Sequence, residues 1–216
     1  MCPFSRKVRL VLAEKKLEFD ALEERFWEAR PEFMELNPAG EVPVLTQDEG
    51  QDPLADGIAI SEYLDELHRE PPLLPSDPRD RAEVRRLVGW FDAKFNREVT
   101  VPLVGEKILK RLISSRSEPD SKAIRNGYSA IHRHLDYIAW LAERRTWLAG
   151  SSFSMADITA AAHISCIDYM GDVPWEGHQG AKDWYVRVKS RPSFRSLLED
   201  HVQGIPPARH YADLDF

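Results

Sequence analysis

The first residues of the chain place a cysteine where a helix is expected to begin. Cys2-Pro3-Phe4-Ser5 stands directly before segment 6–12, whose apolar residues recur with a helical period. Thiol–disulfide enzymes carry Cys-x-x-Cys at such a helix N-terminus, where the helix dipole stabilises a thiolate. Here Ser5 stands in place of the second cysteine, so no internal disulfide can form. Any thiol chemistry at Cys2 therefore needs an external thiol, such as glutathione.

Two interpretations of Cys2 stay open: a reactive thiolate, or a small residue retained in an inactive pocket. Ser5 is better explained as a polar residue at the helix terminus than as a nucleophile. Cys166 lies among isoleucines and His163 lies in the same apolar segment, so both are predicted to be interior residues. No cluster of His, Cys and carboxylates has metal-ligand spacing, and no Gly-rich phosphate loop is present. The sequence therefore predicts no metal site.

Charge and cysteine content restrict the class of protein. The 216 residues carry a net charge of −7, from 36 acidic and 29 basic residues, which argues against general nucleic-acid binding. Two cysteines form no disulfide framework, so a reducing cytosol is expected. No apolar run of about 18 residues is present, and no signal peptide. We expect a cytoplasmic protein that neither binds nucleic acid nor inserts into a membrane.

Residues 1–69 mix short strands and helices. Apolar periodicity predicts a helix over 5–16 and another from 58 to 67. Alternating residues predict a strand over 17–23, a second over 41–46 after the turn-forming segment 37–40, and a return strand at 54–55.

Four prolines lie between positions 71 and 78 and indicate a linker over 70–78. Beyond it, helical periodicity dominates, with predicted helices over 80–96, 120–145 and 183–190. Ser154 and Asp157 predict a capping box at the start of a further helix. We therefore divide the chain into an α/β domain (1–69), the linker (70–78), an all-helical domain (79–205) and a tail (206–216).

This organisation resembles the cytosolic glutathione S-transferase fold: a thioredoxin-like N-terminal domain followed by an all-helical C-terminal domain. The resemblance covers nearly the whole chain, on the segments CPFSRKVR, NPAGEVPVL, LADGIAISEYL, WLAGSSFSMADITAA and WYVRVKSRP. In that family a strand precedes the Cys/Ser loop, whereas only Met1 precedes Cys2. We expect residues to be missing there, because without that strand a neighbouring strand would be unpaired and the first helix poorly anchored.

The resemblance also implies a site. Cys2 matches the reactive cysteine of omega-type transferases, and Val42 matches the residue whose backbone pairs with the cysteinyl part of glutathione, before a cis-proline at Pro43. Asp56-Gly57 matches an acidic residue and a serine that hold the γ-glutamyl end, although Asp56 could equally cap the helix that follows. Gly57 lacks the serine hydroxyl, and one lost hydrogen bond to a charged group weakens binding about tenfold or more. We therefore expect a vestigial glutathione site and no cofactor.

Three further segments could meet a partner. The first is a basic island over 107–125, which is either a solvated loop between helices or a binding patch. Its cations are Lys107, Lys110, Arg111, Arg116, Lys122 and Arg125, of which the first three are the predicted partner contacts. Trp27 is predicted at the rim of the pocket, as a substrate wall or an interface anchor. The tail alternates acidic and apolar groups and could dock on its own domain or, as we favour, on a partner; its residues are Tyr211, Asp213, Leu214, Asp215 and Phe216.

With these departures the chain resembles the transferase-fold division proteins of alphaproteobacteria, on CPFSRKVRLVLAEKKLEF, WFDAKFNREVT and the terminal ADLDF. That resemblance implies a homodimer that binds polymers of the tubulin-like GTPase FtsZ at the division site. It also implies bending of the filaments without glutathione chemistry. The alternative is a glutathione-dependent transferase or thiol reductase, with Cys2 as nucleophile, Val42 and Asp56 as binding residues, and Trp27 beside the second substrate.

Overall fold

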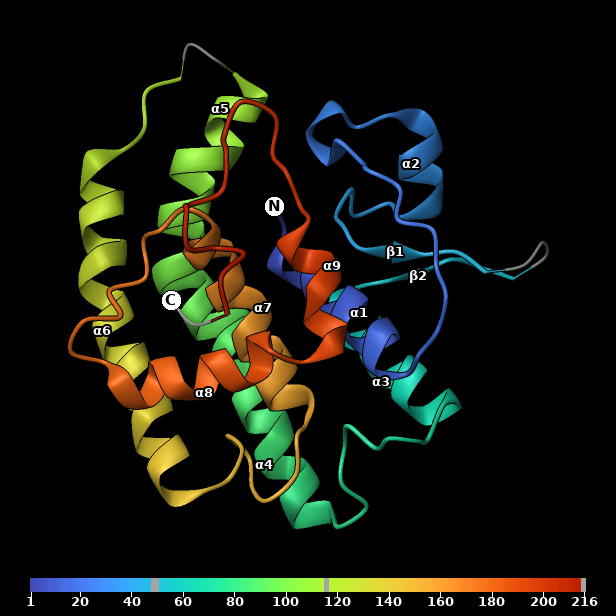
Figure 1. Ribbon diagram of the computed structural model, residues 1–216. Coiled ribbons are helices and arrows are strands. Elements are labelled where there is room, and N and C mark those ends of the chain that lie inside the picture. Colours follow the sequence, from blue (N-terminus) through green and yellow to red (C-terminus); the bar gives the residue numbers. More distant parts are fainter. Residues whose placement is uncertain (48–50, 115–116, 215–216) are drawn as a thin grey trace.

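A computed structural model describes residues 1–47, 51–114 and 117–214. Figure 1 shows a small α/β part beside a larger group of helices, with α1 between the two. In chain order, the elements are α1 (Pro3–Glu14), the 3₁₀ turn η1 (Phe26–Glu28), α2 (Pro31–Leu36), β1 (Val44–Leu45), β2 (Leu54–Ala55), α3 (Gly57–Leu67), α4 (Pro78–Gly89), the π-helical η2 (Trp90–Leu109), α5 (Lys110–Ile113), α6 (Ser121–Arg144), α7 (Met155–Tyr169), α8 (Gln179–Lys189), η3 (Pro192–Phe194) and α9 (Arg195–Leu198). The predicted fold class, a small α/β domain followed by a helical domain, is confirmed.

Within the described residues the sheet has two antiparallel strands, with Val44 opposite Ala55 and Leu45 opposite Leu54. The pairing predicted for 41–46 with 54–55 is confirmed, although the first strand is shorter. The strand predicted over 17–23 is wrong: these residues have no strand structure, and the Leu22 side chain is 90% exposed. Alternation alone did not make a strand because the described chain offers this segment no neighbouring strand to exchange backbone hydrogen bonds with.

Helix α1 begins two residues before the prediction, because Pro3 occupies its first turn, where a missing N–H costs nothing. The helix is largely enclosed, and two of its cationic side chains, together with Lys15 at its C-cap, are buried. Each has a carboxylate partner: Arg6–Asp200 at 3.0 Å, Lys7–Asp92 at 2.5 Å and Lys15–Asp65 at 2.5 Å. Ion pairs and apolar packing therefore hold α1 on both sides, and the expectation that residues are missing before Cys2 stays a prediction.

Helix α7 forms the centre of the helical region, and every residue from Met155 to Tyr169 is buried. The predicted capping box is confirmed, with the Ser154 N–H donating to Asp157 Oδ2 at 3.1 Å. Asp77 and Asp120 likewise cap α4 and α6 through backbone N–H groups of the first turn. In the described part of the chain, no helix has both the length and the apolar character needed to cross a membrane.

Candidate functional site: the start of helix α1

Cys2 lies at the N-cap of α1 in extended backbone, and its side chain makes no capping hydrogen bond. The half-buried thiol instead faces the loop before β1, with Sγ 3.8 Å from the carbonyl oxygen of Val42. The Val42–Pro43 peptide bond is cis, as the resemblance implied. The structure thus brings together Cys2 and Val42, which lie 40 positions apart in the sequence.

Asp56 caps α3. Its Oδ1 accepts hydrogen bonds from the backbone N–H groups of Ile58 at 2.7 Å and Ala59 at 2.9 Å. Its backbone has φ +77°, in the left-handed region that non-glycine residues rarely occupy. The capping interpretation is confirmed, while a role in holding an amine stays a prediction.

Gly57 lies where α3 approaches α1 closely. A Cβ atom at this position would lie 3.2 Å from Cβ of Phe4 and 3.5 Å from Cε of Lys7. A serine would require Phe4 to shift by a few tenths of an ångström, whereas the approach to Lys7 is an ordinary contact. The absence of a side chain at Gly57 therefore allows the two helices to pack closely, and Gly57 offers only its backbone to a ligand.

A buried polar chain runs from Lys7 into the helical region. Asp92 accepts from Lys7 Nζ at 2.5 Å and contacts His163 Nε2 at 3.2 Å, and His163 Nδ1 lies 2.9 Å from the hydroxyl of Thr100. Burial lowers the pKa of His163, against the raising effect of the Asp92 carboxylate. Burial would raise the pKa of Asp92, but its contacts with His163 and Lys7 bring it below its usual value. The prediction of an interior, hydrogen-bonded histidine is confirmed.

Trp27 lies half-buried in η1 and packs edge-to-face on Phe26, with ring centroids 5.4 Å apart. Its role as a substrate wall or an interface anchor stays a prediction.

Two cations of the basic island are paired with carboxylates within the fold. Lys107 Nζ donates to Asp172 at 2.5 Å and to the hydroxyl of Tyr128 at 3.0 Å, and Lys110 pairs with Glu106 at 2.7 Å. Burial would lower the pKa of Lys107, but these two hydrogen bonds raise it overall. Arg111 on α5 is exposed. Of the three cations predicted as partner contacts, Lys107 and Lys110 already have carboxylate partners inside the chain, and Arg116 of the island lies outside the described residues.

The tail requires a correction, because Tyr211 is completely buried and its side chain cannot face a partner. Its hydroxyl accepts a hydrogen bond from Arg6 Nη1 at 2.9 Å and donates to the Leu197 carbonyl at 3.0 Å. Burial raises the pKa of Tyr211 to about 12. Asp213 and Leu214 are exposed, whereas Asp215 and Phe216 lie outside the described residues.

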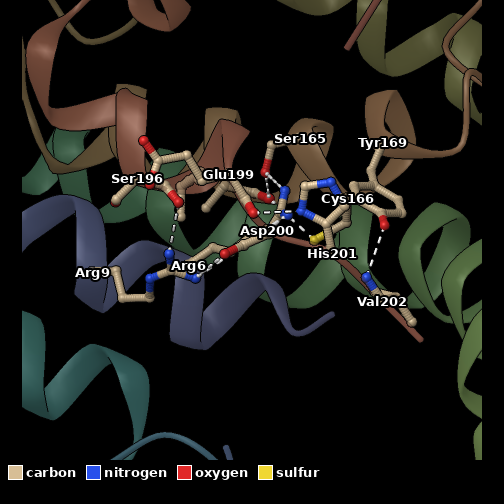
Figure 2. Close-up of polar contacts among 12 residues, drawn as sticks. Arg6, Arg9, Ser165, Cys166, Tyr169, Ser196, Glu199, Asp200, His201 and Val202 are labelled. Atoms are coloured by element: carbon tan, nitrogen blue, oxygen red, sulfur yellow. Dashed lines mark hydrogen bonds and ion pairs between the residues drawn. The ribbon is translucent and has the colours of Figure 1, made fainter. Parts of the chain in front are cut away.

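Figure 2 shows how two arginines of α1 hold the chain near its C-terminal end. Arg6 donates to Ser165 of α7 at 2.8 Å and to Asp200 at 3.0 Å. Arg9 donates to both carboxylate oxygens of Asp200 at 2.9 Å and to the Ser196 carbonyl at 3.0 Å. Sequence reasoning missed this cluster; arginines three residues apart on one face of an otherwise apolar helix were the available signal.

Cys166 lies beside this cluster, and its environment makes the thiol unreactive. It is fully buried, and its Sγ donates to the Ala162 carbonyl at 3.4 Å. Burial raises the pKa of this thiol to about 11, so it stays protonated at neutral pH. The prediction of a core cysteine is confirmed.

Comparison with known proteins agrees with this geometry. The glutathione S-transferase N-terminal domain matches residues 1–67, and the C-terminal domain matches residues 99–192. Over 216 residues, the chain is 51% identical to FtsZ-localized protein A of Caulobacter vibrioides, covering 99% of this chain and 94% of that protein. The chain belongs to the glutathione S-transferase family. Its resemblance to that family, inferred from the motifs, is confirmed.

Two solved structures of this family superpose closely on the chain. A glutathione S-transferase from Rhodospirillum rubrum F11 is 58% identical with a TM-score of 0.96, covering 100% of this chain and 96% of the other. FzlA from C. crescentus is 51% identical with a TM-score of 0.95, again covering 100% and 96%. In this fold, Cys2 and Val42 face each other.

Proposed function

We propose that this protein binds FtsZ polymers and alters their curvature, and that it does so without glutathione chemistry. The observation that carries the proposal is the 51% identity to FtsZ-localized protein A, which extends over 99% of this chain. A relative of that similarity and coverage supports a shared partner more strongly than the fold does, because one fold hosts many functions.

The glutathione site supports the non-enzymatic part of the proposal. Gly57 supplies no hydroxyl for a γ-glutamyl carboxylate, and Asp56 Oδ1 is occupied by two N–H groups of α3. The loss of one hydrogen bond to a charged group costs about 1.5–3 kcal/mol, which is tenfold or more in affinity. We propose that Val42, Asp56 and Gly57 are remnants of a ligand site and that the protein uses no cofactor.

The end of the tail supports a protein contact. Buried Tyr211 holds the backbone in place, so the exposed residues Asp213 and Leu214 begin from a fixed position. A segment held in place before binding loses less conformational entropy when the complex forms. We propose Asp213, Leu214, Asp215 and Phe216 as partner-binding residues, with Arg111 and Trp27 as further contacts. Tyr211 takes the role of anchor.

A homodimer would carry two copies of this surface. On a polymer with repeating subunits, the second contact forms at a raised effective concentration, so binding strengthens without new contacts. We propose that the protein is cytoplasmic, reaches the division site through FtsZ, and needs neither nucleic acid nor membrane insertion.

Co-sedimentation with FtsZ tests the proposal. The purified chain is expected to pellet with FtsZ assembled by GTP and to stay in the supernatant with FtsZ kept unassembled in GDP. Electron microscopy of the same samples is expected to show more strongly curved filaments. A chain that stays in the supernatant with assembled FtsZ, at concentrations where the relative pellets, contradicts the proposal.

One observation favours a second candidate, a glutathione-dependent transferase or thiol reductase. The Cys2 thiol is half-buried at a helix N-terminus, 3.8 Å from the carbonyl that would pair with a cysteinyl group. In this reading Cys2 is the nucleophile and Trp27 lines the second-substrate site. Calorimetry at about 1 mM glutathione separates the two candidates, because binding at that concentration corresponds to about −4 kcal/mol or better. We expect no measurable heat.

A further inference from the structure

Two histidines from different helices meet at the outer face of the helical region. His132 lies on α6, and His178 is the N-cap residue of α8. Nδ1 of His132 is 2.9 Å from Nε2 of His178, and the ring centroids are 5.1 Å apart. His132 is exposed, whereas His178 is only 8% exposed.

A carboxylate lies behind the buried ring. Oδ1 of Asp136, one turn after His132 on α6, is 3.0 Å from Nδ1 of His178. This Nδ1 atom is buried and has no well-aligned hydrogen bond. A small rotation of the ring would direct an Nδ1–H at the carboxylate and fix the lone pair on Nε2, which faces His132. An outer carboxylate that fixes the tautomer in this way is the usual second partner of a metal-binding histidine.

The separation of the two nitrogens suits a metal ion. Two imidazole nitrogens bound to a tetrahedral Zn²⁺ at 2.0–2.1 Å lie about 3.3 Å apart. The two nitrogens now point toward each other, so the present 2.9 Å would need to open by about 0.4 Å and the exposed His132 ring would need to turn until both nitrogens face the metal. A metal between the rings would take the place of their present contact.

Solvent can complete the coordination. Asp136 and His178 border an open hollow of about 370 Å³, together with Glu143 and Gln179. In residues 1–47, 51–114 and 117–214, no group of three or more His, Cys, Asp and Glu side chains is arranged to hold a metal. The histidine pair would therefore supply two ligands, and water or a further group the remaining positions.

We propose that His132 and His178 form a site for a borderline divalent transition metal, of the kind that imidazole ligands prefer, with Asp136 as the residue that positions His178. A metal there would join α6 to α8 across 46 positions of sequence. This inference is independent of FtsZ binding. Motif spacing did not predict the site, because its two nitrogens come from separate helices.

Zinc titration of the chain without an affinity tag tests the site. The chain is first stripped with a chelator and then titrated with Zn²⁺ in competition with a chromogenic chelator. We expect one Zn²⁺ per chain at this site, no detectable binding at it in His132→Gln or His178→Gln, and about tenfold weaker binding in Asp136→Asn. The matched control is His201→Gln, because His201 is exposed and outside the pair; its affinity should equal that of the wild type.

A second measurement uses only the wild type and therefore does not require that the variants fold. X-ray absorption of the wild type with one equivalent of Zn²⁺ should show two imidazole ligands. Since His132 is exposed, His132→Gln is expected to fold normally and decides the case if His178→Gln does not. Absence of binding by the wild type at roughly 100 µM Zn²⁺, or unchanged affinity in a folded His132→Gln, overturns the proposal.

Discussion

The hydroxyl of Tyr211 lies 2.9 Å from Nη1 of Arg6, a contact between residues 205 positions apart. Both side chains are buried, and the same hydroxyl donates to the Leu197 carbonyl. The relationship makes the first part of the tail a component of the core, whereas Asp213 and Leu214 after it are exposed.

Replacing Tyr211 by phenylalanine removes this hydroxyl and keeps the ring. We expect Tyr211→Phe to lower the free energy of unfolding by about 1–3 kcal/mol, because a buried guanidinium and a buried carbonyl each lose a partner. Urea unfolding measures the change. The matched control is Tyr63→Phe, whose hydroxyl bonds Gln47 at the exposed surface and should matter little. Equal losses in the two variants would show that burial of the Tyr211 bond adds nothing.

Gly57→Ser tests whether close packing explains this glycine. The added Cβ would lie 3.2 Å from Cβ of Phe4, so we expect a loss of about 1–3 kcal/mol in stability. The restored hydroxyl should strengthen any residual glutathione binding. Gly89→Ser is the control, since nothing lies within 4 Å of a Cβ there. Thermal unfolding and calorimetry with glutathione give the two readouts. Micromolar glutathione binding by Gly57→Ser would favour the enzyme interpretation.

Asp213→Lys reverses an exposed charge beyond the Tyr211 anchor. At a close contact, repulsion and desolvation should weaken binding to FtsZ polymers at least tenfold, or by about 1.4 kcal/mol or more. The melting temperature should barely change. Deletion of 213–216 should weaken binding to the same extent and likewise leave the melting temperature nearly unchanged. Asp52→Lys, at another exposed site, makes the same charge change and should pellet normally. A large fall in melting temperature would instead mean that these residues stabilise the fold.

Cys2→Ala tests the thiol directly. If the protein acts through contacts, this variant should pellet with FtsZ polymers as the wild type does, because the Cys2 side chain makes no capping bond and only a 3.8 Å contact with a carbonyl. Sedimentation affinity and a melting curve are measured together. Loss of binding with an unchanged melting curve would identify a functional thiol.

Stability should decrease in mildly acidic solution. Burial lowers the pKa of both His134 and His163 in the folded chain, against the raising effects of Glu98 and Asp92. The unfolded chain, with histidine pKa values near 6.5, therefore binds more protons as the pH falls below that value, and stability is lost. Each histidine contributes a slope of at most about 1.4 kcal/mol per pH unit. Urea unfolding at pH 7.0 and 5.5 should show the loss, and His163→Gln should reduce the slope. A flat profile would contradict the lowered pKa values.

Local signals could be predicted from the sequence because they act within one turn of helix. The capping box of Ser154 and Asp157, and the position of Cys2 before α1, are of this kind. The strand expected over 17–23 failed because a strand depends on a neighbour that local sequence does not reveal. The prediction that Tyr211 contacts a partner failed for a related reason, because Arg6, to which it bonds, lies 205 positions away in the sequence. An alternating tail has the same pattern whether it packs on its own domain or on a partner.

The enclosure of α1 also bears on how the chain is made. Arg6 and Arg9 are translated about 190 residues before Asp200, the carboxylate that they share. During synthesis these guanidinium groups stay hydrated, and α1 lacks the partners that let it enter a low-dielectric interior. Final closure of the fold must therefore wait until Asp200 has been translated, as expected for contacts between distant segments. Ribosome-bound chains that end before Asp200 should remain open to proteases at α1.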